Sequence, residues 1–302
     1  MGEIRFDGRV AVVTGAGGGL GKTYALELAR RGASLVVNDL GGAADGTGSG
    51  TGMADATVQE IVAAGGRALA NYDSVATPEG GRAIVQAALD AFGRVDVLVN
   101  NAGILRDKSF AKLEPAQLEA VLDVHLKGGF FVTQPAFSSM KEQGYGRIVM
   151  VSSGAGIFGN FGQSNYGAAK MGLVGLMNVL AVEGAKYDIK VNAIAPVART
   201  RMTEQILGPL ADALDPQLVT PLVTFLCSEQ CALTHEIFDV GGGRYARIFV
   251  GLCRGWLAPA GGAPQPEEIL ANLDSIRDQK GYTVPDSITG ELQAIAEAIQ
   301  QR

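Results

Sequence analysis

The sequence predicts a doubly wound α/β fold with one parallel sheet and a helical extension at the C-terminus. Short β-branched runs alternate with segments of helical length along most of the chain. Runs such as VAVVT and VLVN are almost wholly apolar, which is typical of parallel strands covered by helices on both faces. A glycine-rich turn follows the first run, beyond the carboxyl end of a strand, where folds of this class bind their ligands.

Seven strands and several helices follow from this alternation. The expected helices include 21–31, which opens on the glycine turn, and 167–186, whose apolar spacing suits a largely buried helix. The segment GGAADGTGSGTG, between Leu40 and Met53, is too rich in glycine for regular structure and predicts a long loop. The expected strands are Val10–Thr14, Ser34–Asn38, Arg67–Asn71, Val95–Asn100, Arg147–Ser152, Lys190–Ile194 and Glu236–Val240.

The sheet pattern stops after Val240, which divides the chain into two parts. Residues 1–243 are expected to form one domain built around the sheet and the glycine-rich turn. Residues 244–302 are expected to be an extension with helices at 266–279 and 289–300, packed on the core or on a second subunit.

Composition excludes several classes of partner. The 302 residues include 25 basic and 31 acidic side chains, a net charge of −6, and no cluster of Lys or Arg interleaved with aromatics. Nucleic acid is therefore an improbable partner. The N-terminal segment lacks a signal-peptide pattern, no apolar run approaches a membrane span, and the last residues, IQQR, do not match a peroxisomal signal of the SKL type. We therefore expect a cytoplasmic protein without a membrane partner.

The cysteines and histidines predict no catalytic metal. The three cysteines, Cys227, Cys231 and Cys253, form no paired framework and are expected to be small buried hydrophobic residues. Only two histidines, His125 and His235, are present, and no HExxH-type spacing supplies further ligands.

The first strand-to-helix turn is the expected cofactor site. Gly15, Gly19 and Gly21, with Leu20 between the last two, allow a backbone turn whose N–H groups face a pyrophosphate at a helix N-terminus. Asp39 ends the next strand, where a carboxylate would accept hydrogen bonds from ribose hydroxyls and repel a 2′-phosphate. The pattern is that of a Rossmann fold and favours NAD over NADP, although Asp39 could alternatively cap a turn.

A third strand end carries Asp73 and Ser74. These residues follow the predicted strand Arg67–Asn71 and could bind the edge of an adenine ring. Taken alone they fit a turn equally well, so both interpretations stay open at this point.

Three side chains farther along the chain are candidates for catalysis. Tyr166 and Lys170 lie four residues apart, on one face of the expected helix, and Ser153 follows a strand just before them. Tyrosine is a weak base at neutral pH, but a lysine ammonium and a cationic nicotinamide would stabilise its phenolate. Ser153 could hold a substrate oxygen while Tyr166 gives or takes the proton.

Taken together, TGAGGGLG, NNAG at 100–103, Ser153, and Tyr166 with Lys170 resemble the short-chain dehydrogenase/reductase family over roughly residues 6–243. The resemblance implies that Tyr166 is the catalytic acid/base and also contacts the cofactor. It implies that Lys170 supports Tyr166 and binds the nicotinamide ribose, and that Ser153 positions the substrate. It further implies that Asn100 and the segment from Pro196 to Thr200 line the cofactor cleft.

Two positions depart from the usual family pattern. His125, in DVHLKGGF, stands where the family usually has an asparagine that supports a proton-relay water, and Pro196-Val197 replaces the usual Pro-Gly. His125 could serve the relay through its backbone carbonyl or be a purely structural helix residue.

Within the family, the segments VVNDLGG, NNAGILRDKSF, VHLKG, GNFGQSNY and APVARTRMT are similar to the (3R)-hydroxyacyl-CoA dehydrogenase units of type 2 peroxisomal multifunctional enzymes. The likeness implies NAD-dependent oxidation of (3R)-hydroxyacyl-CoA in β-oxidation, a separate enoyl-CoA hydratase that supplies the substrate, and a homodimer. A 17β-hydroxysteroid dehydrogenase or a 3-oxoacyl-carrier-protein reductase remains the alternative, although Asp39 argues against the NADPH that such reductases usually prefer.

Overall fold

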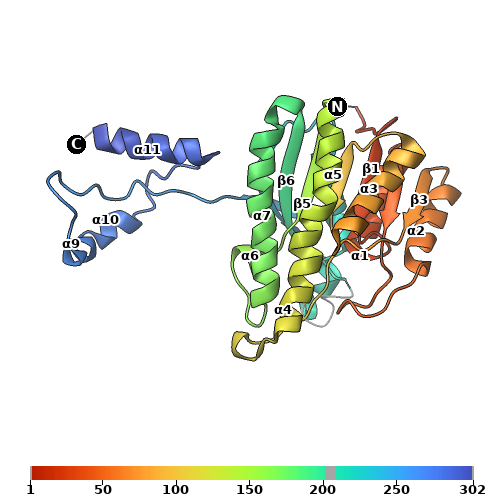
Figure 1. Ribbon diagram of the computed structural model, residues 1–302, viewed down its shortest axis with the longest axis horizontal. Helices are drawn as coiled ribbons and strands as arrows, with labels where there is room; N and C mark the ends of the chain where they lie inside the picture. The colour runs from red at the N-terminus through yellow and green to blue at the C-terminus, as the bar shows by residue number, and fades with distance from the viewer. Residues whose placement is uncertain (1, 201–207, 301–302) are drawn as a thin grey trace. The chain divides into compact units, whose positions relative to one another are not determined.

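The computed structural model describes residues 2–200 and 208–300. The chain divides into two compact units, residues 1–247 and residues 248–302. The first unit holds the sheet, and the second begins four residues after the boundary at 243 expected from the sequence (Figure 1).

An eight-stranded sheet with the order β3-β2-β1-β4-β5-β6-β7-β8 forms the centre of the first unit. The six pairs of neighbouring strands from β3 to β7 in this order are all parallel. In β1, for example, Val13 lies beside Val37 of β2 on one side and Val99 of β4 on the other. The order reverses between β1 and β4, which leaves a crevice at the carboxyl ends of the strands. The doubly wound fold is confirmed. Its strands are β1 Val10–Thr14, β2 Ser34–Asn38, β3 Arg67–Asn71, β4 Val97–Asn100, β5 Gly146–Val151, β6 Ile189–Pro196, β7 Ile237–Gly241 and β8 Arg244–Ile248.

Helices cover both faces of this sheet. Helices α3, α5 and α7 pack in sequence on one face, and α1 packs between α2 and α8 on the other (Figure 1). Every residue of β1, β2, β4 and β5 is buried, which explains their unbroken apolar runs. The helices are α1 Gly19–Arg30, α2 Gly52–Ala63, α3 Pro78–Phe92, α4 Pro115–Leu122, α5 Gly128–Gln143, α6 Gly154–Ile157, α7 Ser164–Gly184 and α8 Thr220–Leu226, with shorter turns at Phe110–Lys112, Ala185–Tyr187, Gly208–Ala213 and Pro216–Leu218.

Strand β8 is a difference from the expectation that the sheet ends after Val240. Gly242 and Gly243 both have positive φ, 57° and 78°, and their two-residue turn can join β7 only to an antiparallel neighbour. The β8 residues are exposed or half-buried, so the strand lacks the apolar run that marks the interior strands.

The segment Ser164–Tyr187, which contains α7, is long and apolar enough to cross a membrane by length and composition alone. In this structure 44% of its most apolar window is buried. Leu173, Val174 and Met177 are buried, and the helix packs on β5 and β6. Its apolar character is therefore explained by its place against the sheet.

The second unit has no buried residue between positions 248 and 300. The expected helix 266–279 is divided at Asn272 into α9 Pro266–Ala271 and α10 Leu273–Arg277, and the expected helix 289–300 is α11 Ile288–Gln300. Along α11, Ile288, Leu292, Ile295 and Ile299 recur at helical spacing and are about half exposed or more. A unit without a core of its own needs another surface to cover this apolar row. That it packs on the core or on a partner stays a prediction.

Candidate active site

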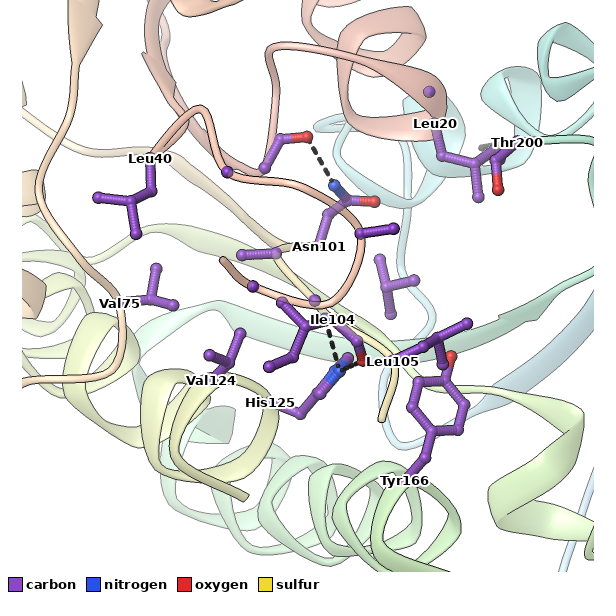
Figure 2. A pocket seen from close by; sticks show the side chains of 18 of the residues that line it. Leu20, Leu40, Val75, Asn101, Ile104, Leu105, Val124, His125, Tyr166 and Thr200 are labelled. Carbon is purple, nitrogen blue, oxygen red and sulfur yellow. Dashed lines mark hydrogen bonds between the residues drawn. The ribbon is translucent and has the colours of Figure 1, made fainter. Parts of the chain in front are cut away.

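A cavity of about 540 Å³ opens at the carboxyl ends of the parallel strands. Its lining includes Gly15 after β1, Asp39 after β2, Asn101 after β4, Ser153 after β5 and Pro196 at the end of β6. Five strands thus each deliver a residue to one site, and Tyr166, His125 and Ile104 lie around the same space (Figure 2). The volume lies within the range of sites for cofactors and drug-sized ligands.

The glycine turn brings the backbone close to this cavity. Gly15 and Gly19 have φ values of +64° and +53°, and both line the cavity with Leu20. No acidic side chain stands in the first turn of α1, so its N-terminal N–H groups and dipole favour an anion there. The turn therefore fits the pyrophosphate of a dinucleotide.

Gly21 has a different role from the other two glycines. It is buried and does not line the cavity, and a Cβ atom there would lie 2.2 Å from the Gly15 carbonyl oxygen. The third glycine thus allows close packing of α1 against the turn.

The Asp39 carboxylate faces the cavity and also organises the backbone around it. One oxygen accepts a hydrogen bond from the Gly17 N–H at 2.8 Å, and the other accepts one from the Gly41 N–H at 2.7 Å. Asp39 therefore does cap a turn, as one of the two interpretations of the sequence proposed. Because a carboxylate has about four acceptor positions, Asp39 can still accept from ribose hydroxyls.

Asp73 and Ser74 line the cavity and are also part of a turn. The Asn71 side chain donates to Asp73 Oδ2 at 2.7 Å, and the Ala76 N–H donates to Ser74 Oγ at 3.2 Å. Both residues therefore belong to the cavity wall, and their local hydrogen bonds hold that part of the wall in place.

The expectation that Asn100 lines the cleft requires correction. Its buried amide donates to Thr133 Oγ1 at 2.8 Å, on the side of α5, and it does not line the cavity. Successive side chains of a strand point to opposite faces, so the next residue, Asn101, reaches the site instead. Asn101 Nδ2 donates to the Thr14 and Gly15 carbonyl oxygens at 2.9 and 3.1 Å, which ties the glycine turn to the end of β4.

The glycine-rich loop after β2 forms another wall. The Gly50 N–H donates to the Leu40 carbonyl oxygen at 2.9 Å and closes the two ends of the loop. The Leu105 N–H donates to the Ala44 carbonyl oxygen, also at 2.9 Å, and ties the loop to the segment after β4. Arg106 Nε also donates to Asp45 O at 2.9 Å. The sequence predicted a loop here but gave no sign of these partners, since all but the guanidinium are backbone groups.

Pro196 and Thr200 line the cavity as expected, and Thr200 lies beside Leu20 (Figure 2). The last residues of the segment APVARTRMT, 201–203, lie outside the described residues.

The three catalytic candidates meet at the same cavity. Ser153 caps α6, where its Oγ accepts from the Ala155 N–H at 3.2 Å, and Ser153 and Tyr166 line the same cavity. Lys170 Nζ lies 5.5 Å from the Tyr166 ring centroid and donates to the Val151 carbonyl oxygen at 2.6 Å. Strand β5 thus supplies both the serine and the carbonyl that holds the lysine.

Burial works against the charged forms of both Tyr166 and Lys170. Desolvation raises the pKa of Tyr166, the Ser153 hydroxyl lowers it, and Asp107 raises it. Desolvation lowers the pKa of Lys170 from 10.5 to about 7. A tyrosinate and an ammonium at this site would stabilise each other, so each would oppose the effect of burial on its neighbour.

His125 lies in a π-helical turn, Asp123–Lys127, between α4 and α5. Its ring is 3% exposed and meets the Tyr166 ring edge-on, with centroids 5.1 Å apart and an interplanar angle of 86°. Such π turns often occur at functional sites. The sequence marked His125 as a departure but gave no sign of this contact.

The described residues contain no group of three or more His, Cys, Asp or Glu that could hold a metal ion.

Comparisons with known proteins identify the family. The model of the short chain dehydrogenase family matches residues 9–208. A short-chain type dehydrogenase/reductase of Mycobacterium tuberculosis is 58% identical over 80% of this chain and 84% of its own length. The chain belongs to the short-chain dehydrogenase family. It is therefore an oxidoreductase, and the resemblance drawn from TGAGGGLG, NNAG and the Tyr-Lys pair is confirmed.

This short-chain dehydrogenase is also similar to parts of longer proteins. Peroxisomal multifunctional enzyme type 2 of Mus musculus is 48% identical over 99% of this chain, which spans 40% of the mouse protein. The solved structure of the full-length peroxisomal multifunctional enzyme type 2 of Drosophila melanogaster matches with a TM-score of 0.84 and 38% identity, over 99% of this chain and 50% of that one. The similarity extends beyond the sheet into residues 248–302.

A third solved structure bears on the cofactor. A 7α-hydroxysteroid dehydrogenase in complex with NADH and 7-oxo glycochenodeoxycholic acid matches with a TM-score of 0.72 and 29% identity, over 79% of this chain and 95% of that one. Together with the family assignment and the glycine turn, this supports a nicotinamide dinucleotide as the cofactor.

Proposed function

We propose that this short-chain dehydrogenase oxidises (3R)-hydroxyacyl-CoA to 3-oxoacyl-CoA with NAD, as a step of fatty-acid or sterol side-chain β-oxidation. The convergence of Ser153, Tyr166 and Lys170 on one cavity beside the glycine turn is the observation that carries the proposal. The multifunctional enzymes that share nearly the whole of this chain support the thioester substrate.

In this proposal each residue of the site has a defined role. Gly15, Gly19 and the α1 N-terminus hold the pyrophosphate, and bound NAD supplies the nicotinamide that accepts a hydride. Ser153 holds the substrate oxygen. Tyr166, as its phenolate, takes the hydroxyl proton as the carbonyl forms and becomes a neutral phenol. Lys170 stabilises the phenolate before this transfer and positions the nicotinamide ribose.

The preference for NAD is assigned to the Asp39 charge. Asp39→Asn is expected to lower the NAD/NADP ratio of kcat/KM at least tenfold, since a carboxylate and a phosphate about 4 Å apart repel by up to ~4 kcal/mol near a protein surface. The Tm is expected to fall as well, because an amide cannot accept from both Gly17 and Gly41. Steady-state kinetics with both cofactors measures the ratio.

Asp45→Asn is the matched control for this prediction. Its side chain belongs to the same loop but bonds only within it, to Thr47, and does not line the cavity. The control is expected to keep the wild-type cofactor ratio. An unchanged ratio in Asp39→Asn would remove the role assigned to Asp39.

A substrate panel separates the proposed reaction from its alternatives. NADH formation is measured with (3R)-hydroxyacyl-CoA thioesters of several chain lengths and with a free 17β-hydroxysteroid, and 3-oxoacyl thioesters are tested in reverse with NADPH. Turnover of the thioesters with NAD is the expected result. Activity on the steroid alone, or only in reverse with NADPH, would reject the proposed substrate while keeping the catalytic residues.

We further propose that the enzyme is a homodimer and that a separate enoyl-CoA hydratase supplies its substrate. On the outer face of α7, Val179 and Val182 are 55% and 57% exposed, and Phe130 on α5 is 49% exposed. A second copy would bury these side chains. Light scattering tests this: V179E/V182E is expected to give a monomer if α7 forms the interface. The cytoplasmic location stays a prediction, which cell fractionation tests.

A further inference from the structure

The His125 imidazole is a buried polar group at the cavity to which the assigned reaction gives no task. Its Nε2 lies 3.0 Å from the Ile104 N–H and 2.8 Å from the Ile104 carbonyl oxygen. Nδ1 has no hydrogen-bond partner among the described residues. Ile104 belongs to the segment that follows β4 and lines the cavity.

The same ring is held on two further sides. One contact is the edge-on meeting with Tyr166. On another side the ring lies so close to Gly103 that a Cβ atom there would stand 2.3 Å from His125 Cε1. Gly103 has no positive φ, so the ring itself, rather than the backbone conformation, excludes a side chain at this position.

The surroundings of the imidazole argue against an acid/base role. Burial lowers the pKa of His125 to about 3, the nearby Lys170 lowers it too, and the bond to Ile104 raises it. The ring is therefore neutral across the working range of the enzyme. The backbone carbonyl oxygen of His125 already accepts a hydrogen bond from the Gly128 N–H. We therefore look for the role of His125 in its side chain rather than in its carbonyl group.

We propose that His125 is a positioning residue whose side chain clamps the 103–104 backbone to the ring of Tyr166. One end of the imidazole fixes the cavity wall through Ile104, and the ring edge or face fixes the orientation of the phenol. The reach of the Tyr166 hydroxyl to a bound substrate then depends on a residue that does not itself exchange the proton. The inference rests on the proposed role of Tyr166.

Single substitutions separate the two halves of the clamp. His125→Phe keeps an aromatic ring but loses the hydrogen bond to Ile104, and His125→Gln keeps a polar group but loses the ring. Each is expected to lower kcat, and His125→Ala is expected to lower it by about ten- to a hundredfold, because small misplacements of a catalytic group have effects of this size. The KM for NAD is expected to stay within about twofold. A thermal melt with the wild-type Tm would show that the lower kcat does not come from unfolded enzyme.

A double-mutant cycle with Gly103→Ala provides the decisive test. The added methyl group pushes against the ring, so G103A alone is expected to lower kcat. In the His125→Ala background the ring is gone, and G103A is expected to have little further effect, which gives a clear coupling term. Additive losses, or unchanged kcat in His125→Ala, would overturn the proposal.

The pH profile and one control variant distinguish the remaining outcomes. Between pH 5 and 8, the pH profiles of kcat for the wild type and for His125→Gln are expected to have the same inflections. An inflection that is present in the wild type and absent from His125→Gln would make His125 an acid or base instead. If His125→Ala does not fold, the Phe and Gln variants with G103A complete the comparison. Full activity in Tyr166→Phe would reject the proposed function itself, whereas an inactive Tyr166→Phe with a fully active His125→Ala would reject only the clamp.

Discussion

Tyr166→Phe is expected to lower turnover by about a thousandfold or more, because it removes the hydroxyl to which we assign the substrate proton and general acid–base catalysis contributes up to about 10⁴-fold. The half-buried phenol lines the cavity, and phenylalanine keeps its ring, so the substitution removes the proton acceptor with little change in volume. Initial rates of NADH formation measure the effect.

Binding of the cofactor serves as the control for this variant. The glycine turn and Asp39 stand on other strands and are untouched, so stabilisation of Tyr166→Phe by NAD in thermal melts should equal that of the wild type. Tyr72→Phe is a matched substitution, because Tyr72 is 40% exposed and outside the cavity. It should keep full activity. Wild-type turnover in Tyr166→Phe would remove the proposed mechanism.

Lys170→Met is expected to lower turnover at neutral pH by about a hundredfold or more, since the phenolate loses its positive neighbour in a dry site. The rising limb of the pH profile for oxidation is expected to move to higher pH, because Tyr166 then holds its proton more tightly. Methionine keeps most of the length of the lysine side chain, so packing changes little. A profile that coincides with the wild type would contradict the role of Lys170.

The same substitution has a second signature, in stability. Burial lowers the pKa of Lys170 from 10.5 to about 7, so between these pH values the unfolded chain binds a proton that the folded chain does not. The free energy of unfolding therefore rises with pH in this window, by at most about 1.4 kcal/mol per pH unit. Lys170→Met is expected to lose this slope and the exposed Lys112→Met to keep it, as urea unfolding at several pH values would show.

Much of the fold could be predicted because its signals are local. Interior strands are buried on both faces and read as apolar runs, and Gly15, Asp39, Tyr166 and Lys170 stand at fixed distances from strand ends and helix starts. Strand β8 could not be found in this way, since its residues are exposed or half-buried and its turn is only a pair of glycines.

The rest of the site depends on direction and on long-range contacts. Asn100 and Asn101 are the same residue type, so the sequence does not distinguish their roles. Side chains alternate in direction at the end of β4, and for this reason Asn101 lines the cavity whereas Asn100 contacts Thr133. The bonds from His125 to Ile104 and from Leu105 to Ala44 join segments 21 and 61 residues apart, one through a ring nitrogen and one through backbone. Neither leaves a pattern along the chain.

The stereochemical preference with NAD is the most direct measurement of the central claim. Initial rates of NADH formation from matched (3R)- and (3S)-hydroxyacyl-CoA would be compared in the wild type and in Tyr166→Phe. The expected result is turnover of the (3R) thioester by the wild type alone, with no comparable rate for the (3S) isomer. Equal rates for the two isomers, preference for the (3S) form, or turnover in Tyr166→Phe would contradict the account.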